Sequence, residues 1–163
     1  MVAYMNDKIE KTTTLKAPLA KVWRAISDSM AFGTWFGMTI DGPFVEGQTV
    51  VGTIAQTQVD DEIARHLEPY VGMRCELRIA RIVPLKLLAF RWHPGAEPDM
   101  GPSAPTTLVT FALEEVDGGT RLTITESGFD ALPLEQRTKA FAENEGGWEV
   151  QLSLIAKYLV REV

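Results

Sequence analysis

The end of the chain, Pro133–Glu162, carries the apolar pattern of a long amphipathic helix. Large apolar side chains recur there at intervals of four, three and four residues. They are Trp148, Leu152, Ile155 and Leu159. This spacing lines one face of a helix with 3.6 residues per turn. A helix with one apolar face needs a large apolar surface to pack against.

Two adjacent glycines, Gly146 and Gly147, interrupt this pattern just before Trp148. Each glycine inside a helix costs about 1 kcal/mol relative to alanine, so the pair predicts a kink or a break. We therefore expect Pro133–Asn144 to form a separate helical piece that leads into the main helix. A glycine pair would also allow the helix to approach a sheet closely.

The preceding chain contains short segments, rich in β-branched residues, in which apolar and polar side chains alternate. Such segments are typical of strands with one buried face. The expected strands are Lys8–Lys16, Thr49–Gln56, Arg74–Val83, Leu87–His93, Thr106–Glu115 and Thr120–Ser127. Asp117-Gly118-Gly119 predicts a tight hairpin between the last two, because these residues tolerate positive φ. Gly52, inside a strand, indicates a bulge or a close approach by another group.

Three short helices are also expected. Pro18 suits the first position of a helix, where its missing N–H costs nothing, and apolar residues follow it at helical spacing as far as Ile26. The aromatic stretch Asp28–Gly37 predicts a second short helix that ends in a turn. Residues 57–72 predict a third helix, stopped by Pro69, which we interpret as an insertion over the sheet edge.

The composition argues against several classes of protein. The chain has 163 residues, of which 45% are hydrophobic and 23% charged, as in one ordinary globular domain with a substantial core. No apolar run approaches the ~20 residues of a membrane span. Acidic residues outnumber basic ones by 22 to 16, so nucleic acid is not expected as a partner. The chain start lacks a secretory pattern and Cys75 is the single cysteine, so we expect a cytoplasmic protein.

The order of elements and five stretches of sequence resemble a known family. The stretches are KAPLAKVWRAIS, GPFVEGQTV, PLKLLAFRW, VTFALEEVDGGTRLTITESGF and EGGWEVQLSLIAKYL. They are similar to the bacterial proteins related to the C-terminal domain of the activator of heat-shock-protein-90 ATPase, within the START-like (SRPBCC) helix-grip superfamily. The resemblance covers residues 8–160, and Gly118–Phe129 and Gly147-Trp148 are its most specific parts. Two features depart from the family pattern: the 57–72 segment, and Glu126, where many relatives carry histidine.

The resemblance implies an α+β helix-grip fold, in which an antiparallel sheet of about seven strands wraps around the long C-terminal helix, with two short helices after the first strand. Residues 1–163 would form a single START-like domain, with 57–72 as an insertion or lid. Seven strands require one more than the pattern provides, and we place the extra division within residues 42–56. The resemblance also implies an apolar pocket between sheet and helix, the usual binding site in the superfamily.

A set of mainly aromatic side chains is the candidate lining of that pocket, because aromatic residues line most small-molecule sites. The candidate ligand-binding residues are Trp35, Phe36, Met38, Trp92, Phe111, Glu126, Phe129, Trp148 and Leu152. Plain core packing is the alternative for each aromatic member. Strand alternation places Trp92 on the apolar face of its strand, and Arg91 and His93 on the opposite face.

Glu126 is the charged member of this set. It shares a strand face with Leu122 and Ile124, so alternation carries its carboxylate inward, where a charge is costly unless it is paired or lines a wet cavity. The functional interpretation is a polar anchor or a general base. The structural interpretation is a salt bridge with Arg91 or Arg78.

Other chemistry has little support in the sequence. Glu62 and His66, four residues apart, give too few ligands for a divalent metal in a chain with two histidines, so no metal or other cofactor is expected. Cys75 lies on an expected strand and is interpreted as a small buried hydrophobe rather than a nucleophile. The sequence has neither a nucleophile elbow nor a phosphate-binding loop.

Three functions remain. The preferred one is a non-catalytic cytoplasmic protein that holds a small, largely apolar molecule between sheet and helix, with Glu126 and the rim residues Arg91 or His93 orienting a polar group. The second, implied only by the resemblance, is an accessory protein of the heat-shock-protein-90 chaperone. The third is a cyclase or dehydratase acting on an aromatic polyketide-like substrate, with Glu126 and either His93 or a tyrosine as its acid–base pair. Both monomer and homodimer are compatible with the sequence.

Overall fold

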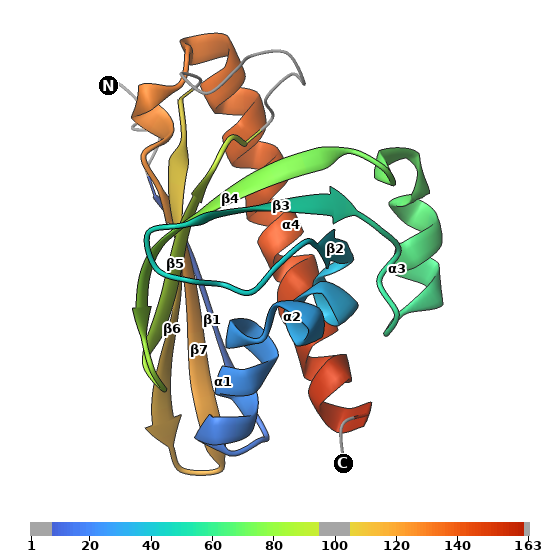
Figure 1. Cartoon of the computed structure of the whole chain (residues 1–163), viewed down its shortest axis with the longest axis vertical. Coiled ribbons are helices and arrows are strands. Elements are labelled where there is room, and N and C mark those ends of the chain that lie inside the picture. Colours follow the sequence, from blue (N-terminus) through green and yellow to red (C-terminus); the bar gives the residue numbers. More distant parts are fainter. Residues whose placement is uncertain (1–7, 95–104, 162–163) are drawn as a thin grey trace, which may run out of the picture.

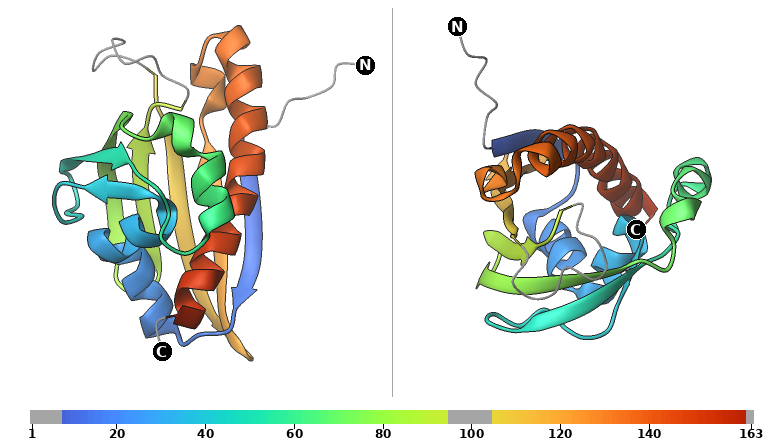
Figure 2. Two further views of the ribbon diagram at one scale, coloured as in Figure 1. Left: turned by 90° about the vertical axis from the view of Figure 1, so that its right-hand side faces the viewer. Right: turned by 90° about the horizontal axis from the view of Figure 1, so that it is seen from above.

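A computed structural model describes residues 8–94 and 105–161. Seven antiparallel strands form one sheet in the order β1-β7-β6-β5-β4-β3-β2, and the long helix α4 lies along its inner side (Figures 1 and 2). The strands are β1 (Lys8–Leu15), β2 (Met38–Ile40), β3 (Thr49–Ile54), β4 (Arg74–Val83), β5 (Leu87–Trp92), β6 (Thr107–Val116) and β7 (Gly119–Ser127). The helices are α1 (Leu19–Ser27), α2 (Ser29–Phe36), α3 (Asp61–His66) and α4 (Leu134–Arg161), with short 3₁₀ turns η1 (Glu68–Tyr70) and η2 (Phe129–Ala131). The predicted helix-grip fold is confirmed.

The hairpin between β6 and β7 forms where the sequence predicts it. Gly118 and Gly119 both adopt positive φ, at 86° and 152°. A Cβ on Gly119 would stand 1.9 Å from the Leu15 carbonyl oxygen, so only glycine lets the end of β1 pass this turn. The turn thereby fixes the register of β7 against β1 as well as against β6.

The seventh strand lies outside the region in which the sequence predicts it. It is β2, directly after α2, rather than a division within residues 42–56. Gly37, with φ of 89°, ends α2 and turns the chain straight into β2, which pairs Ile40 with Gly52 of β3. A Cβ on Gly52 would stand 2.2 Å from the Met38 sulfur, so the close approach predicted at Gly52 is confirmed.

The helices after β1 and β3 also occur as predicted. Asp28 caps α2 by accepting a hydrogen bond from the Met30 N–H at 3.1 Å, a local reason for the helix to begin there. Residues 57–72 contain α3 and η1, which project from the end of the β3–β4 pair (Figure 2). Pro69 does not end α3, since α3 stops at His66 and Pro69 lies within η1.

The long C-terminal helix is unbroken, and the predicted break at the glycine pair is wrong. α4 continues through Gly146 and Gly147 over 28 residues. The two glycines lie on its exposed side, and a Cβ on either would meet no atom within 4 Å, so they do not serve a close approach to the sheet. The free energy gained by burying Trp148, Leu154 and Ile155 on the opposite side is larger than the free energy that the two glycines cost the helix.

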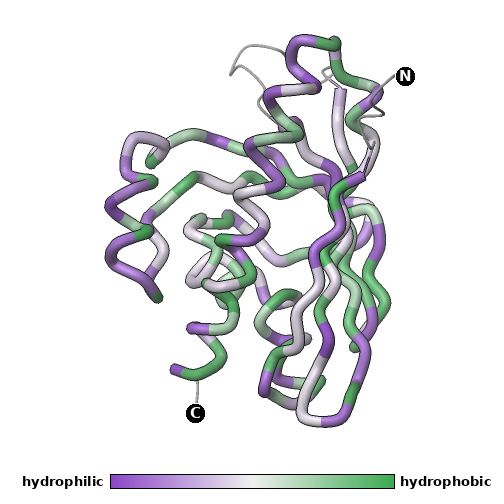
Figure 3. Tube along the Cα trace, turned by 180° about the vertical axis from the view of Figure 1, so that it is seen from behind, coloured by the Kyte–Doolittle hydropathy of each residue, from purple (hydrophilic) through white to green (hydrophobic). Residues whose placement is uncertain are grey.

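Hydropathy alternates along α4 and along the strands, as expected for elements with one face toward a shared core (Figure 3). The core lies between the inner face of the sheet, α1, α2 and α4. Among the described helices, none combines the length and the apolar character that crossing a membrane requires.

The glycine pair provides a test of the helix. Replacing Gly146 or Gly147 by alanine should stabilise the protein by about 0.5–1 kcal/mol each, because the added methyl groups meet no atom and the unfolded chain loses freedom. Urea denaturation followed by tryptophan fluorescence measures the change. A loss of stability in both variants would contradict the uninterrupted helix.

Candidate functional site

The inner face of the sheet carries one connected aromatic cluster. Phe32 of α2 is its centre, with ring centroids of Trp35, Phe36, Phe44, Phe90 and Phe111 at 4.7–6.5 Å. Five candidate residues belong to the cluster: Trp35, Phe36, Trp92, Phe111 and Trp148. Phe32 is not among the residues predicted from the sequence, although it lies three and four residues before Trp35 and Phe36, on the same helical face.

Three rings form the outer part of this cluster. The Trp92 and Trp148 indoles stack with centroids 5.6 Å apart and an interplanar angle of 28°. Phe36 lies 6.4 Å from Trp92 and 6.1 Å from Trp148. Phe36 and Trp92 remain partly exposed while Trp148 is buried, so the cluster reaches the surface between α2, β5 and α4.

Two other candidate residues lie outside the ring cluster. Phe129 is fully buried in η2 and packs its ring on Phe141 of α4 at 5.1 Å. Met38 is buried over Gly52. Neither contacts the stacked indoles of Trp92 and Trp148 in the described ring pairs. Besides each other, Trp92 contacts Phe36 and Phe90, and Trp148 contacts Phe36 and Phe111.

Glu126 is fully buried, as strand alternation predicts, and its carboxylate accepts four hydrogen bonds. Oε1 accepts from Trp148 Nε1 at 2.8 Å and Asn144 Nδ2 at 2.9 Å. Oε2 accepts from Trp92 Nε1 at 2.8 Å and the Thr107 hydroxyl at 2.5 Å. A carboxylate offers about four acceptor positions, so these neutral donors fill its hydrogen-bonding capacity.

This network differs from the salt bridge that was the structural interpretation of Glu126 in the sequence. Arg78 and Arg91 are direct cross-strand partners on the exposed outer face of the sheet, whereas Glu126 faces inward with Ile124 and Leu122. The interpretation of Glu126 as the partner of either arginine is therefore wrong. Hydrogen bonds from two indoles, an amide and a hydroxyl stabilise the buried charge instead.

The other donors to Glu126 were also missed by sequence reasoning. Asn144 lies four residues before Trp148 on α4, hence on the same helical face, and Thr107 faces inward with Val109 on β6. Both are polar residues on otherwise apolar faces, a pattern that marks them as partners of a buried polar group. His93 does not join them: its Nδ1 lies 3.1 Å from the Pro105 carbonyl oxygen. The acid–base pair of Glu126 and His93 is therefore not assembled.

A buried acceptor without a partner lies beside the exposed edge of the ring cluster. Gln151, between Trp148 and Leu152 on α4, donates from Nε2 to the Phe36 carbonyl oxygen at 3.3 Å. Its Oε1 is buried and has no hydrogen-bond partner among the described residues. Since Nε2 must face the Phe36 carbonyl, Oε1 keeps its position as a free acceptor. Leu152 on the same turn is partly exposed.

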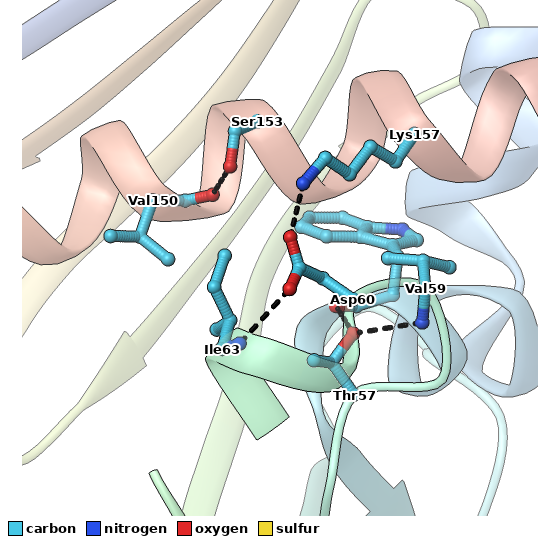
Figure 4. A network of polar contacts seen from close by, with 8 residues as sticks. Thr57, Val59, Asp60, Ile63, Val150, Ser153 and Lys157 are labelled. Atoms are coloured by element: carbon cyan, nitrogen blue, oxygen red, sulfur yellow. Dashed lines mark hydrogen bonds and ion pairs between the residues drawn. The ribbon is translucent and has the colours of Figure 1, made fainter. Parts of the chain in front are cut away.

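The 57–72 segment is tied to the same helix. Lys157 of α4 forms an ion pair with Asp60, whose other oxygen caps α3 through the Ile63 N–H at 3.0 Å (Figure 4). The hydrogen bond from Lys157 is the main reason that the pKa of Asp60 lies below its ordinary value. Arg161 donates to the Gln58 carbonyl oxygen. These contacts hold the start of the segment against the C-terminal half of α4.

Cys75 and the acidic residues of α3 offer no assembled reactive centre. Burial raises the pKa of the Cys75 thiol to about 11, so the thiol is protonated near neutral pH and behaves as a small hydrophobe. In the described part of the chain, no three side chains of the metal-binding types gather to hold an ion.

Two open hollows lie away from the ring cluster. One, of about 500 Å³, is lined by residues 16–19 and 115–119. The other, of about 400 Å³, is lined by Val59, Ala156, Lys157, Val160 and Arg161. None of the candidate ligand-binding residues lines either hollow, so the pocket between sheet and helix stays a prediction.

Sequence comparison assigns the chain to a family. The family model described as "Activator of Hsp90 ATPase homolog 1-like protein" matches residues 16–160. The chain belongs to the Activator of Hsp90 ATPase homolog 1-like family. The resemblance noted in the sequence is thus confirmed. No curated protein matches the sequence of this chain.

Solved structures share the fold of this chain. A protein from Mesorhizobium loti is 21% identical, with a TM-score of 0.71, over 94% of this chain and 97% of that one. The Aha1 dimer from Colwellia psychrerythraea is 19% identical, with a TM-score of 0.64, over 93% and 95%. DynU16, a protein in the dynemicin biosynthetic locus, is 21% identical, with a TM-score of 0.68, over 95% of this chain. The present chain spans about half of DynU16, 48% of its length.

The Glu126 network predicts a large effect of a small change. In Glu126→Gln, the new amide N–H₂ faces two of the four donors, and each donor left without an acceptor costs about 1–3 kcal/mol. We expect a loss of about 2–5 kcal/mol in the free energy of unfolding, measured by urea denaturation. The matched control is Glu145→Gln, an exposed position on α4, which should change stability little. Equal stability of the two variants would refute the network.

Cys75 gives a pH-dependent prediction. Its pKa of about 11, against 9.0 for an ordinary thiol, implies about a hundredfold smaller thiolate fraction at pH 8 in the folded protein. Alkylation by iodoacetamide at pH 8, followed by mass spectrometry, should be slower than in the urea-unfolded chain by at least that factor. Because the native state holds the proton more tightly, stability should fall as pH rises from 9 towards 11. Similar folded and unfolded alkylation rates would contradict the burial of this thiol.

Proposed function

We propose that this protein binds a small, largely apolar molecule at the exposed edge of the ring cluster, between α4 and the β5 side of the inner face. Phe36 and Trp92 present partly exposed rings there, and Leu152 extends the apolar surface along α4. Partly exposed aromatic side chains beside a few polar groups are typical of small-molecule sites. Membership of a helix-grip family, in which a ligand commonly lies between sheet and helix, supports the same location.

The unpartnered Gln151 Oε1 is the observation that carries the proposal. A buried acceptor without a hydrogen bond costs free energy in the empty protein, and a ligand that donates an N–H or O–H to it would recover that cost. The ligand is therefore an apolar molecule with at least one hydrogen-bond donor. The Phe36 ring would contact the apolar part of the ligand. Phe36 is held next to the Gln151 side chain, because Gln151 Nε2 donates a hydrogen bond to the Phe36 carbonyl oxygen.

Glu126 has a supporting role in this proposal. All four of its acceptor positions are filled by protein donors, so it orients the Trp92 and Trp148 indoles rather than contacting the ligand. Arg91 and His93 are not assigned to the rim of this site, because Arg91 lies on the opposite face of β5 and His93, beyond the end of β5, contacts the Pro105 carbonyl oxygen. The more deeply buried candidates Trp35, Phe111 and Phe129 would pack in the core beneath the site rather than contact the ligand.

The other two functions have less support. An accessory role for heat-shock-protein-90 rests on the description of the family alone. A cyclase or dehydratase needs an acid–base pair at the ligand, and Glu126 is saturated with donors. We therefore favour binding without catalysis.

A matched pair of probes tests the proposal. 1-Naphthol and 1-methoxynaphthalene have the same ring system, but only the first donates a hydrogen bond. Quenching of tryptophan fluorescence on titration should give a dissociation constant about three to tenfold lower for 1-naphthol, the value of one neutral hydrogen bond. Gln151→Met should abolish this preference while both probes still bind.

A second pair of variants locates the site. Leu152→Arg should weaken binding of both probes, whereas Val150→Arg, on the exposed side of α4, should leave it unchanged; thermal unfolding checks that both variants are folded. Absence of binding by either probe, or equal effects of the two arginine substitutions, would overturn the proposal.

A further inference from the structure

Four arginines occupy the outer face of the sheet on two neighbouring strands. They are Arg74, Arg78 and Arg81 of β4 and Arg91 of β5, and all four are exposed. The outer face is the side away from α4 (Figure 2). We call these four residues the arginine face. It is unexpected in a chain whose net charge is −6.

The register of β4 and β5 brings these like charges together. Arg78 is the direct cross-strand partner of Arg91, and Arg81 is the partner of Ala89, two residues before Arg91. Directly opposed residues of an antiparallel pair lie on the same face with Cβ atoms about 4.5–5.5 Å apart, and like charges there are destabilising. The fold therefore maintains an unfavourable contact at this place.

No ion pair within 4.0 Å among the described residues involves these arginines, although the Glu46 carboxylate accepts from the Ile82 N–H beside Arg81. The ion pairs within 4.0 Å in residues 8–94 and 105–161 involve Lys8, Lys11, Arg121, Lys139 and Lys157, and none involves the arginine face. Glu76 lies between Arg74 and Arg78 on the same face but pairs with neither. Arg91 donates to the Thr106 hydroxyl at 3.4 Å, a neutral acceptor that leaves most of its guanidinium hydrogen atoms free.

We propose that the arginine face is a docking surface for an acidic segment of a partner protein. Guanidinium groups bind carboxylates in a bidentate manner, and partner carboxylates would remove the repulsion between Arg78 and Arg91. Residues 74 to 81 of β4 extend over roughly 23 Å at about 3.3 Å per residue, too far for one small anion to bridge. By register, Val51, Ala89 and Leu108 share this face as the cross-strand partners of Glu76, Arg81 and Arg91.

The surface is separate from the proposed ligand site. Its side chains point away from the ring cluster, because alternate residues of β5 point to opposite faces. A nucleic acid fits less well, since four cations in an otherwise acidic chain give little of the charge that phosphate backbones require.

A defined peptide tests the docking surface. A fluorescein-labelled octaglutamate peptide should bind the full chain at 50 mM NaCl by fluorescence anisotropy, whereas the matched octaglutamine peptide should not. The double variant Arg78→Gln/Arg91→Gln should weaken binding about tenfold, and 500 mM NaCl should abolish it. The control is Arg121→Gln, because Arg121 on β7 is already paired with Glu114 at 2.9 Å; this variant should bind as wild type does.

Stability of the double variant provides an independent readout. Removing the like-charge pair should raise the melting temperature by about 1–3 °C, so the variant is expected to fold. The proposal is overturned if octaglutamate does not bind, if both substitution sets weaken binding equally, or if the melting temperature falls. It is also overturned if duplex DNA or inorganic phosphate binds the arginine face more tightly than the peptide does.

Discussion

A single buried carboxylate joins the strands to the helix. Glu126 on β7 receives hydrogen bonds from Trp92 on β5, Thr107 on β6, and both Asn144 and Trp148 on α4. A charge in an apolar interior is tolerated only when its hydrogen bonds are complete. The relative positions of three strands and one helix are thus linked, since a shift of any one removes a donor. The non-directional packing of the aromatic rings does not fix those positions as narrowly.

The network also explains how α4 tolerates its glycines. Asn144 and Trp148 flank Gly146 and Gly147 on the sequence, and both are held by the same carboxylate. Two anchored side chains on either side of the pair keep the helix continuous where local propensity alone favours a break. Intrinsic preference is a weak guide wherever directional tertiary contacts of this kind exist.

The sequence was sufficient for most of the fold and for only part of the site. Alternation and turn chemistry located six of the seven strands and carried Glu126 inward, because both signals are local. The strand β2 was missed because three residues are too short for a periodic pattern. The pattern of polar residues on apolar faces singles out Thr107 and Asn144, but it does not show that they meet Trp92 and Trp148 at Glu126, because strand order and the rotation of α4 bring the four together. The loop that joins β5 to β6 lies mostly outside the described residues.

Successive turns of α4 make different contacts. Residues 144 and 148 complete the hydrogen bonds of Glu126. One turn later, Gln151 keeps a buried acceptor free and Leu152 stays partly exposed. Further on, Lys157 and Arg161 secure the 57–72 segment. The proposed ligand site at the middle turn therefore lies between two parts of α4 that are tied to other elements, one through Glu126 and the other through the 57–72 segment.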